Sequence, residues 1–125
     1  MVTNDNEQHK EGGLLNNLSE MLKGVLDGIV LEIISRGEIY GYEIARKLRA
    51  MGFDGIAEAT VYALLLRFEK NRWVRVTKRP SEMGPPRKFY TLNEKGMEEL
   101  RNFWARWDFL SDRLNKLRND GGASG

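Results

Sequence analysis

The sequence predicts an α+β fold that is mostly helical. Three observations predict it: apolar residues recur every three or four positions over the long segments, they alternate over one pair of short segments, and glycine or proline separates these segments. With 125 residues, of which 41% are hydrophobic and 30% are charged, the chain has the size and composition of one globular domain.

The first helical pattern runs from Leu14 to Ile34 and ends at Gly37. Gly24 and Gly28 lie four positions apart inside it, so we expect either a break into two pieces or the close approach of another backbone. The piece before Gly24 would form a helical arm. Residues 1–13 are polar, and we expect a disordered N-terminal tail there.

Two shorter helices follow, from residue 41 or 42 to 51 and from residue 58 to 71. Gly52 closes the first of them, and a turn through Asp54 and Gly55 leads to the second. The second helix has one apolar face, made of Val61, Leu64, Leu65 and Phe68. Two helices joined in this way are typical of the helix-turn-helix motif.

Residues 74–92 are expected to form a β-hairpin. Apolar side chains alternate with others at Val74 and Val76 and again at Tyr90 and Leu92, which is the period of a β-strand. Residues 79–87, between these strands, contain three prolines and a glycine, which cannot continue a ladder and therefore form the loop.

The last predicted helix covers residues 93–118, and residues 119–125 are expected to form a flexible tail. Asn93 is a good N-cap, and Leu92 with Met97 fits a hydrophobic staple. The apolar side chains of this helix cover a stripe of roughly 160°, which is wider than one small hairpin can cover. They are Met97, Leu100, Phe103, Trp104, Trp107, Leu110, Leu114 and Leu117. The stripe therefore implies a partner surface on this helix.

The formal net charge is only +2, but it is unevenly distributed. From Trp73 to Leu92 five cationic residues face one acidic residue, so this stretch carries +4 and the rest of the chain −2. Such a patch suits contact with phosphates, although a basic hairpin also occurs as a solvated sheet edge. A helix, a helix-turn-helix and a basic hairpin follow one another as in a winged helix. We therefore predict a winged helix-turn-helix DNA-binding domain over residues 14–92, followed by a C-terminal helix over residues 93–118.

The second helix of the motif would read DNA with the face opposite its core. This face consists of Ala59, Ala63, Leu66 and Lys70 at its centre and of Tyr62 and Arg67 at its sides. The alanines would let the helix enter a major groove and meet thymine methyl groups, and the tyrosine would reach a base edge or a phosphate. Arg67, Lys70 and Arg72 would contact phosphates. Alternatively, the alanines only favour helix formation and Tyr62 packs against the hairpin.

Missing and badly placed residues exclude several functions. The chain has no cysteine, which excludes disulfides, thiolate nucleophiles and cysteine-based zinc sites and is compatible with a reducing cytosol. Its one histidine, His9, falls in the predicted tail, without a rigid support for metal binding or base catalysis. We therefore predict no enzymatic activity, no metal and no cofactor. The longest apolar run, Val61–Leu66, is far shorter than the roughly 20 residues of a membrane span, so we expect a cytoplasmic protein without membrane contact.

Five short motifs in this order resemble those of a known family. They are Tyr40–Ile44, Ala59–Tyr62, Arg67–Glu69, Gly84–Tyr90 and Leu92–Gly96. Over roughly residues 22–117 the chain resembles the PadR family of bacterial and archaeal transcriptional regulators. The resemblance implies a dimeric winged-helix repressor whose C-terminal helix pairs with its twin, and in many members a response to small, often aromatic, molecules. A single C-terminal helix is similar to the compact branch of that family.

The resemblance also implies which residues meet DNA. Thr60 and Tyr62 match the threonine and tyrosine of the family's reading helix, and Gly84, Arg87 and Lys88 match the glycine and basic pair of its hairpin. The chain departs from the pattern at Ala59, where glycine is usual, and at Ala63, where proline is usual; neither change removes a charged contact. The residues that we expect to contact DNA are Tyr40, Tyr42, Lys47, Glu58, Ala59, Thr60, Tyr62, Ala63, Arg67, Lys70, Lys78, Arg79, Gly84, Arg87 and Lys88.

Trp104 and Trp107 on the last helix suggest a ligand site. Across a two-fold axis each indole would lie near its twin, and two facing indoles could hold a planar aromatic ligand by stacking. Phe103 and Leu110, on the same stripe, would line this site. The alternative, which we favour for Trp104, is that the indoles fill the dimer core.

We therefore predict a dimeric, sequence-specific DNA-binding repressor that a small planar aromatic effector releases by binding at the dimer interface. The alternative is a winged-helix module that binds another protein, without binding DNA, through the face that carries Leu66.

Overall fold

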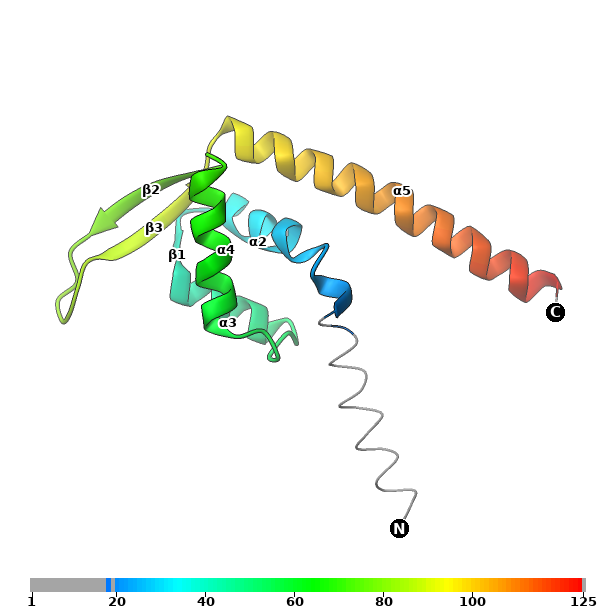
Figure 1. Ribbon diagram of the computed structural model, residues 1–125, viewed down its shortest axis with the longest axis horizontal. Helices are drawn as coiled ribbons and strands as arrows, with labels where there is room; N and C mark the ends of the chain where they lie inside the picture. The colour runs from blue at the N-terminus through cyan, green and yellow to red at the C-terminus, as the bar shows by residue number, and fades with distance from the viewer. Residues whose placement is uncertain (1–17, 19, 125) are drawn as a thin grey trace, which may run out of the picture.

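The computed structural model of the protein describes residue 18 and residues 20–124 (Figure 1). The predicted tail at residues 1–13 lies outside the described residues. The elements follow one another as α2 (Leu26–Ser35), β1 (Ile39–Tyr40), α3 (Gly41–Ala50), α4 (Glu58–Lys70), β2 (Val74–Arg79), β3 (Arg87–Leu92) and α5 (Glu94–Ser124). The predicted α+β winged helix-turn-helix, mostly helical with one small sheet, is confirmed.

The first predicted helix is broken near Gly24. Residues 20–22 are helical, residues 23–25 form a turn, and α2 begins at Leu26. Gly28 lies inside α2, and a Cβ atom added to it would fall 2.2 Å from the ring of Phe103. A break and a close approach therefore both occur, but an aromatic side chain makes the approach where we expected a backbone.

The helix-turn-helix has the predicted boundaries to within about a residue. α3 and α4 pack their apolar faces together, with Ile44, Leu48, Leu65 and Phe68 almost completely buried. The glycine that ends α3, Gly52, has a φ of +97°, a conformation that glycine adopts without steric cost.

The sheet has three antiparallel strands in the order β1-β3-β2. The hairpin β2–β3, which we call the wing (residues 74–92), is as predicted, with Val76 opposite Tyr90 and Val74 opposite Leu92. Strand β1 was not predicted; it places Ile39 opposite Tyr90. In Figure 1 the tip of the wing projects away from the helices.

α5 starts directly after the wing and continues far beyond the core. The predicted N-cap is confirmed, because the Asn93 side-chain oxygen accepts the Gly96 backbone N–H at 2.8 Å. Leu100 and Phe103 join the core, and Figure 1 shows the rest of α5 extending past the other elements. The helix runs to Ser124 and so does not end near Arg118; residues 119–124, predicted as a tail, are helical. Its 31 residues give a length of about 46 Å.

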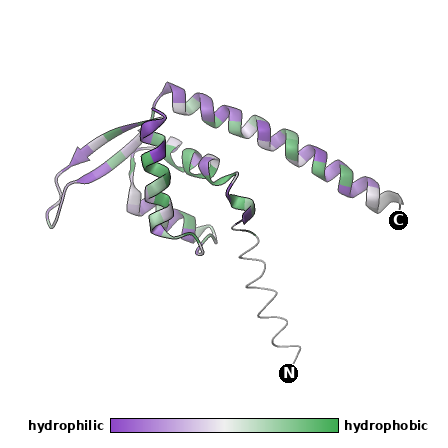
Figure 2. Ribbon diagram, in the orientation of Figure 1, coloured by the Kyte–Doolittle hydropathy of each residue, from purple (hydrophilic) through white to green (hydrophobic). Residues whose placement is uncertain are grey.

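Apolar residues continue along the exposed half of α5. Figure 2 shows hydrophobic and hydrophilic positions alternating along this helix towards its end. The exposed apolar side chains there include Trp107, Leu110, Leu114 and Leu117, which we call the distal stripe. No helix among the described residues is long and apolar enough to cross a membrane.

Candidate nucleic-acid interface

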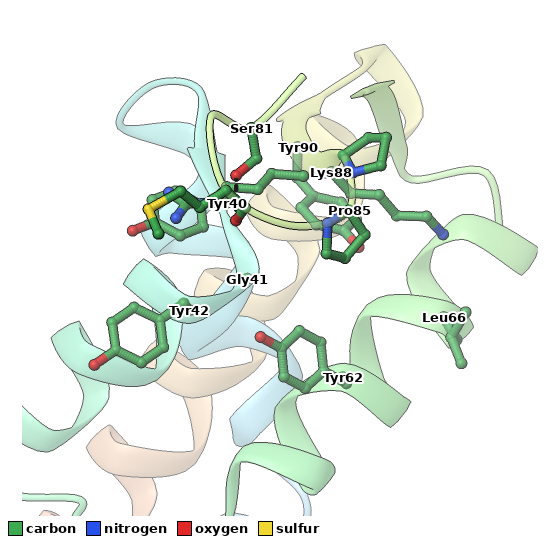
Figure 3. A pocket seen from close by; sticks show the side chains of 12 residues that line it. Tyr40, Gly41, Tyr42, Tyr62, Leu66, Ser81, Pro85, Lys88 and Tyr90 are labelled. Atoms are coloured by element: carbon green, nitrogen blue, oxygen red, sulfur yellow. Dashed lines mark hydrogen bonds between the residues drawn. The ribbon is translucent and has the colours of Figure 1, made fainter. Parts of the chain in front are cut away.

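An open groove of about 510 Å³ separates α4 from the wing and the start of α3 (Figure 3). Tyr62 and Leu66 line it from α4, and Arg87 and Lys88 line it from β3. We call it the wing groove. Six residues with predicted DNA contacts gather here: Tyr40, Tyr42, Tyr62, Arg87 and Lys88 line the groove, and Gly84 lies in the loop at the wing tip, where its φ is +108°.

Gly41 allows Tyr62 to reach the wing groove. A Cβ atom at Gly41 would lie 2.7 Å from the Tyr62 ring, so the tyrosine occupies the space that a side chain on α3 would need. Figure 3 shows Tyr62 extending from α4 towards Gly41. Tyr62 and Tyr42 each remain 44% exposed, so both can meet a ligand in the groove.

Tyr40 supports the wall of the groove. Its ring lies 6.3 Å from that of Tyr42 and 5.5 Å from that of Phe89, measured between centroids. The guanidinium carbon of Arg87 lies 5.0 Å from the Tyr40 centroid, which is a cation–π arrangement. The tyrosine thus holds Arg87 in place while leaving its N–H groups free to bind a phosphate.

Acidic side chains partly neutralise two other cations of the wing. Arg79 forms an ion pair with Glu38 and lies over the Phe89 ring, and Lys88 lies 3.5 Å from a carboxylate oxygen of Glu69. Within the described part of the chain, Arg75, Lys78 and Arg87 have no carboxylate partner at ion-pair distance. Of the wing cations that we predicted to contact DNA, Lys78 and Arg87 therefore have the greatest capacity to bind phosphate.

Arg67, a predicted phosphate contact, forms an ion pair within the chain. Its two terminal nitrogens donate to the two carboxylate oxygens of Asp27 at 2.6 and 2.7 Å, which ties α4 to the first turn of α2. The hydrogen bond with Asp27 raises the pKa of Arg67, against the opposing effect of burial. Asp27 and Arg67 are 40 positions apart, so no local sequence pattern relates them. The structure engages this arginine in a contact within the chain, whereas we predicted a phosphate contact.

The remaining predicted DNA contacts do not line the wing groove. Ala59, Thr60, Ala63 and Lys70 are exposed on α4, and Glu58 at its start lies 3.7 Å from Arg49. Lys47 faces a different groove, between α2, α3 and α5, and is therefore not brought together with the wing.

Tyr90, which the sequence did not identify as a site residue, lines the wing groove from β3. Its side chain is 4% exposed. Burial is the main cause that raises the pKa of Tyr90 to about 12, and the nearby Glu69 and Tyr62 add to it. The phenol therefore stays neutral at physiological pH.

The predicted ligand residues fall into two groups. Phe103 is buried against Gly28, so it belongs to the core and cannot line an open site as predicted. Trp104 donates its indole N–H to Glu32 at 2.9 Å and is 40% exposed. Trp107 and Leu110 lie on the distal stripe, 43% and 49% exposed.

Trp104 also borders a second groove, of about 480 Å³, lined by apolar residues of α2 and α3 such as Ile29, Ile33 and Met51. Glu32 lies at its edge. The hydrogen bond from Arg36 lowers the pKa of Glu32; burial opposes this effect, and the bond from Trp104 adds to it. The carboxylate is therefore a fixed acceptor that orients Trp104. Among the described residues no three His, Cys, Asp or Glu side chains gather as a metal site would require.

Comparison with known proteins identifies the family. The sequence model of the family described as "Transcriptional regulator PadR-like family" matches residues 30–102. The chain is 46% identical to a crystal structure of a Streptococcus transcriptional regulator, which covers 78% of this chain and 96% of that one with a TM-score of 0.71. It is 44% identical to a PadR-like transcriptional regulator from Bacillus cereus, with 78% and 95% covered and a TM-score of 0.70.

A more distant structure shares only the fold. It is Bacillus subtilis PadR in complex with operator DNA, 22% identical, with a TM-score of 0.59 over 64% of this chain and 47% of that one. The resemblance inferred from the five motifs is confirmed, and with it the assignment to regulators and not to enzymes. The chain belongs to the PadR-like family of transcriptional regulators.

Proposed function

We propose that the protein is a dimeric, sequence-specific DNA-binding repressor. The observation that carries this proposal is that α4 and the wing lie on either side of one groove. Exposed tyrosines, Arg87 and Lys88 line this groove. A helix of this kind enters the major groove, and the phosphates beside it would run along the wing. The Bacillus subtilis PadR of the same fold was solved with operator DNA, which supports a related role here.

The distal stripe supports the dimer. Leu110, Leu114 and Leu117 are about half exposed or more in the part of α5 that extends beyond the core. This part of the helix buries too little apolar surface to be stable alone. A second copy offers the same stripe and the apolar groove beside Trp104, so a two-fold pairing would cover both. Two reading helices related by this axis would reach half-sites about 34 Å apart.

The effector would bind where the two stripes meet. We assign the ligand contact to Trp107, with Leu110 beside it. Phe103 is buried, and Trp104 is held by its hydrogen bond to Glu32. Stacking between two indoles would suit a small planar aromatic molecule. Its binding would change the angle between protomers and hence the spacing of the two α4 helices, which would release the operator.

The DNA-binding proposal is tested with Arg87→Ala and Lys78→Ala. We expect each to weaken binding to the DNA upstream of the protein's own gene and to lower the slope of log K against log salt by about one, because each removes one phosphate contact. Lys116→Ala, on the distal part of α5, is the matched control and should change neither quantity. Binding of wild type that is absent, or insensitive to salt, would contradict the proposal.

The second candidate function is a protein-binding module, and one observation favours it. Leu66 is 61% exposed at the centre of the face that we assign to DNA. In that case Leu66→Asp would abolish a protein complex and leave DNA affinity unchanged.

A further inference from the structure

The exposed face of α4 is apolar at its centre. Val61, Leu64, Leu65 and Phe68 are buried. On the opposite side, Ala59, Ala63 and Leu66 are exposed, and Leu66 contributes the largest apolar surface. Its exposure shows that this leucine is not needed to fill the core of the chain.

Before Lys70, its last residue, α4 has no side chain free for bidentate reading of guanine or adenine. Arginine or lysine reads guanine, and asparagine or glutamine reads adenine, through paired hydrogen bonds in the major groove. α4 contains no asparagine or glutamine, and both terminal nitrogens of its one arginine, Arg67, are engaged by Asp27. Glu58, which could accept from cytosine, faces Arg49. Hydrogen bonds are therefore not the main means by which the centre of α4 can distinguish bases.

The side chains around Leu66 are positively charged, which is complementary to the negative charge of a nucleic acid. Leu66 lines the wing groove together with Arg87 and Lys88, and Lys70 follows it one turn later on α4. An apolar protein partner would have to desolvate these cations, whereas a duplex presents phosphates to them. Within B-DNA the one apolar group in the major groove is the 5-methyl group of thymine. An RNA duplex has no such methyl group, and its major groove is too narrow for a helix.

We infer that Leu66, with Ala59 and Ala63 beside it, reads thymine methyl groups, so that each half-site is specified by thymines facing the centre of α4. This inference rests on the proposed DNA-binding function and adds the chemical group that is recognised. Leu66 is a specificity-determining residue in this assignment, and Lys78 and Arg87 supply affinity without regard to sequence.

The test replaces thymine by deoxyuridine, which removes the methyl group and keeps every hydrogen-bonding group. A duplex is first selected by the wild-type protein from a random pool, and each thymine of one half-site is then replaced in turn. We expect at least one replacement to weaken wild-type binding roughly four-fold, the effect of one buried methyl-sized group. Leu66→Ala should bind the thymine duplex more weakly and lose its preference for thymine over deoxyuridine at that position.

Two further variants complete the design. Leu66→Met keeps a large apolar side chain and should retain the preference, whereas Arg87→Ala should weaken binding to both duplexes by the same factor. Tight binding that is unaffected by every deoxyuridine, or a preference that survives in Leu66→Ala, would overturn the inference and leave the DNA-binding function intact. Failure to select any duplex would overturn the function itself and the inference with it. Equal thermal unfolding of Leu66→Ala and wild type verifies that the variant is folded.

Discussion

At the scale of residues, contacts on two sides orient α4, the helix that we propose reads DNA. On one side the missing side chain of Gly41 admits Tyr62, and on the other side Asp27 binds Arg67 through two hydrogen bonds. The helical period correctly indicated which face of α4 is exposed. It could not show that Arg67 binds Asp27, because the acidic partner comes from a helix 40 positions earlier.

Tyr90 gives a prediction at this scale. Its folded-state pKa of about 12 exceeds the ordinary value of 10, so the stability it confers is complete below pH 10 and is lost as pH rises from about 10 to 12. The loss should be on the order of 2 kcal/mol. We expect Tyr90→Phe to remove this part of the pH dependence, measured by urea unfolding between pH 9 and 11.5. Tyr42→Phe, at an exposed phenol, is the matched control; curves for Tyr90→Phe and wild type that remain parallel would contradict the prediction.

At the scale of elements, the sequence predicted four helices and the wing, and it missed β1. The period of apolar residues is clear over ten or more positions, which is why the bounds of α3 and α4 were close. β1 has two residues, too few to show an alternation, and it exists because β3 offers a free edge to Ile39. The end of α5 was misjudged because apolar positions stop at Leu117, although the backbone remains helical to Ser124.

The packing of α2 on α5 gives a prediction for Gly28. In the interior of an exposed helix, alanine in place of glycine usually stabilises by about 1 kcal/mol. At Gly28 the added methyl group would collide with the Phe103 ring, so we expect Gly28→Ala to lower the free energy of unfolding by about 1–3 kcal/mol in urea titrations. Gly24→Ala, where nothing lies within 4 Å, should not show this loss. A stabilised Gly28→Ala protein would show that α2 and α5 do not pack in this way.

At the scale of the whole molecule, the core and the distal part of α5 differ in how they bury apolar surface. The wing, α2, α3, α4 and the start of α5 share one core, to which Phe103 contributes. Beyond Trp104 the helix keeps its apolar stripe but finds no partner among the described residues. The sequence predicted that this stripe is wider than the core can cover. One of the predicted ligand residues, Phe103, is taken up by the core.

Light scattering tests the dimer. We expect wild type at twice the chain mass of 14.4 kDa and the double variant Leu114→Asp, Leu117→Asp at the chain mass, because two buried charges without partners would separate the stripes. The double variant Asn115→Asp, Asn119→Asp adds the same charge outside the stripe and should remain dimeric. A wild-type protein that is monomeric would contradict the predicted dimer.

Fluorescence tests the effector site. A planar aromatic effector should quench the tryptophan fluorescence of wild type, and it should quench neither the monomeric variant nor Trp107→Phe.

The junction between the wing and α5 has a consequence for how such a regulator can diversify. Only Asn93 separates β3 from α5, and Gly96 packs so closely on the Trp73 carbonyl that a Cβ atom there would lie 2.1 Å from its oxygen. The two elements therefore turn together. In a two-fold assembly, the angle at which the two α5 helices cross would set the distance between the two α4 helices. That distance would determine the number of base pairs between the half-sites. Substitutions along that crossing could then adapt the protein to a promoter of different spacer length while every residue that touches the duplex stays the same.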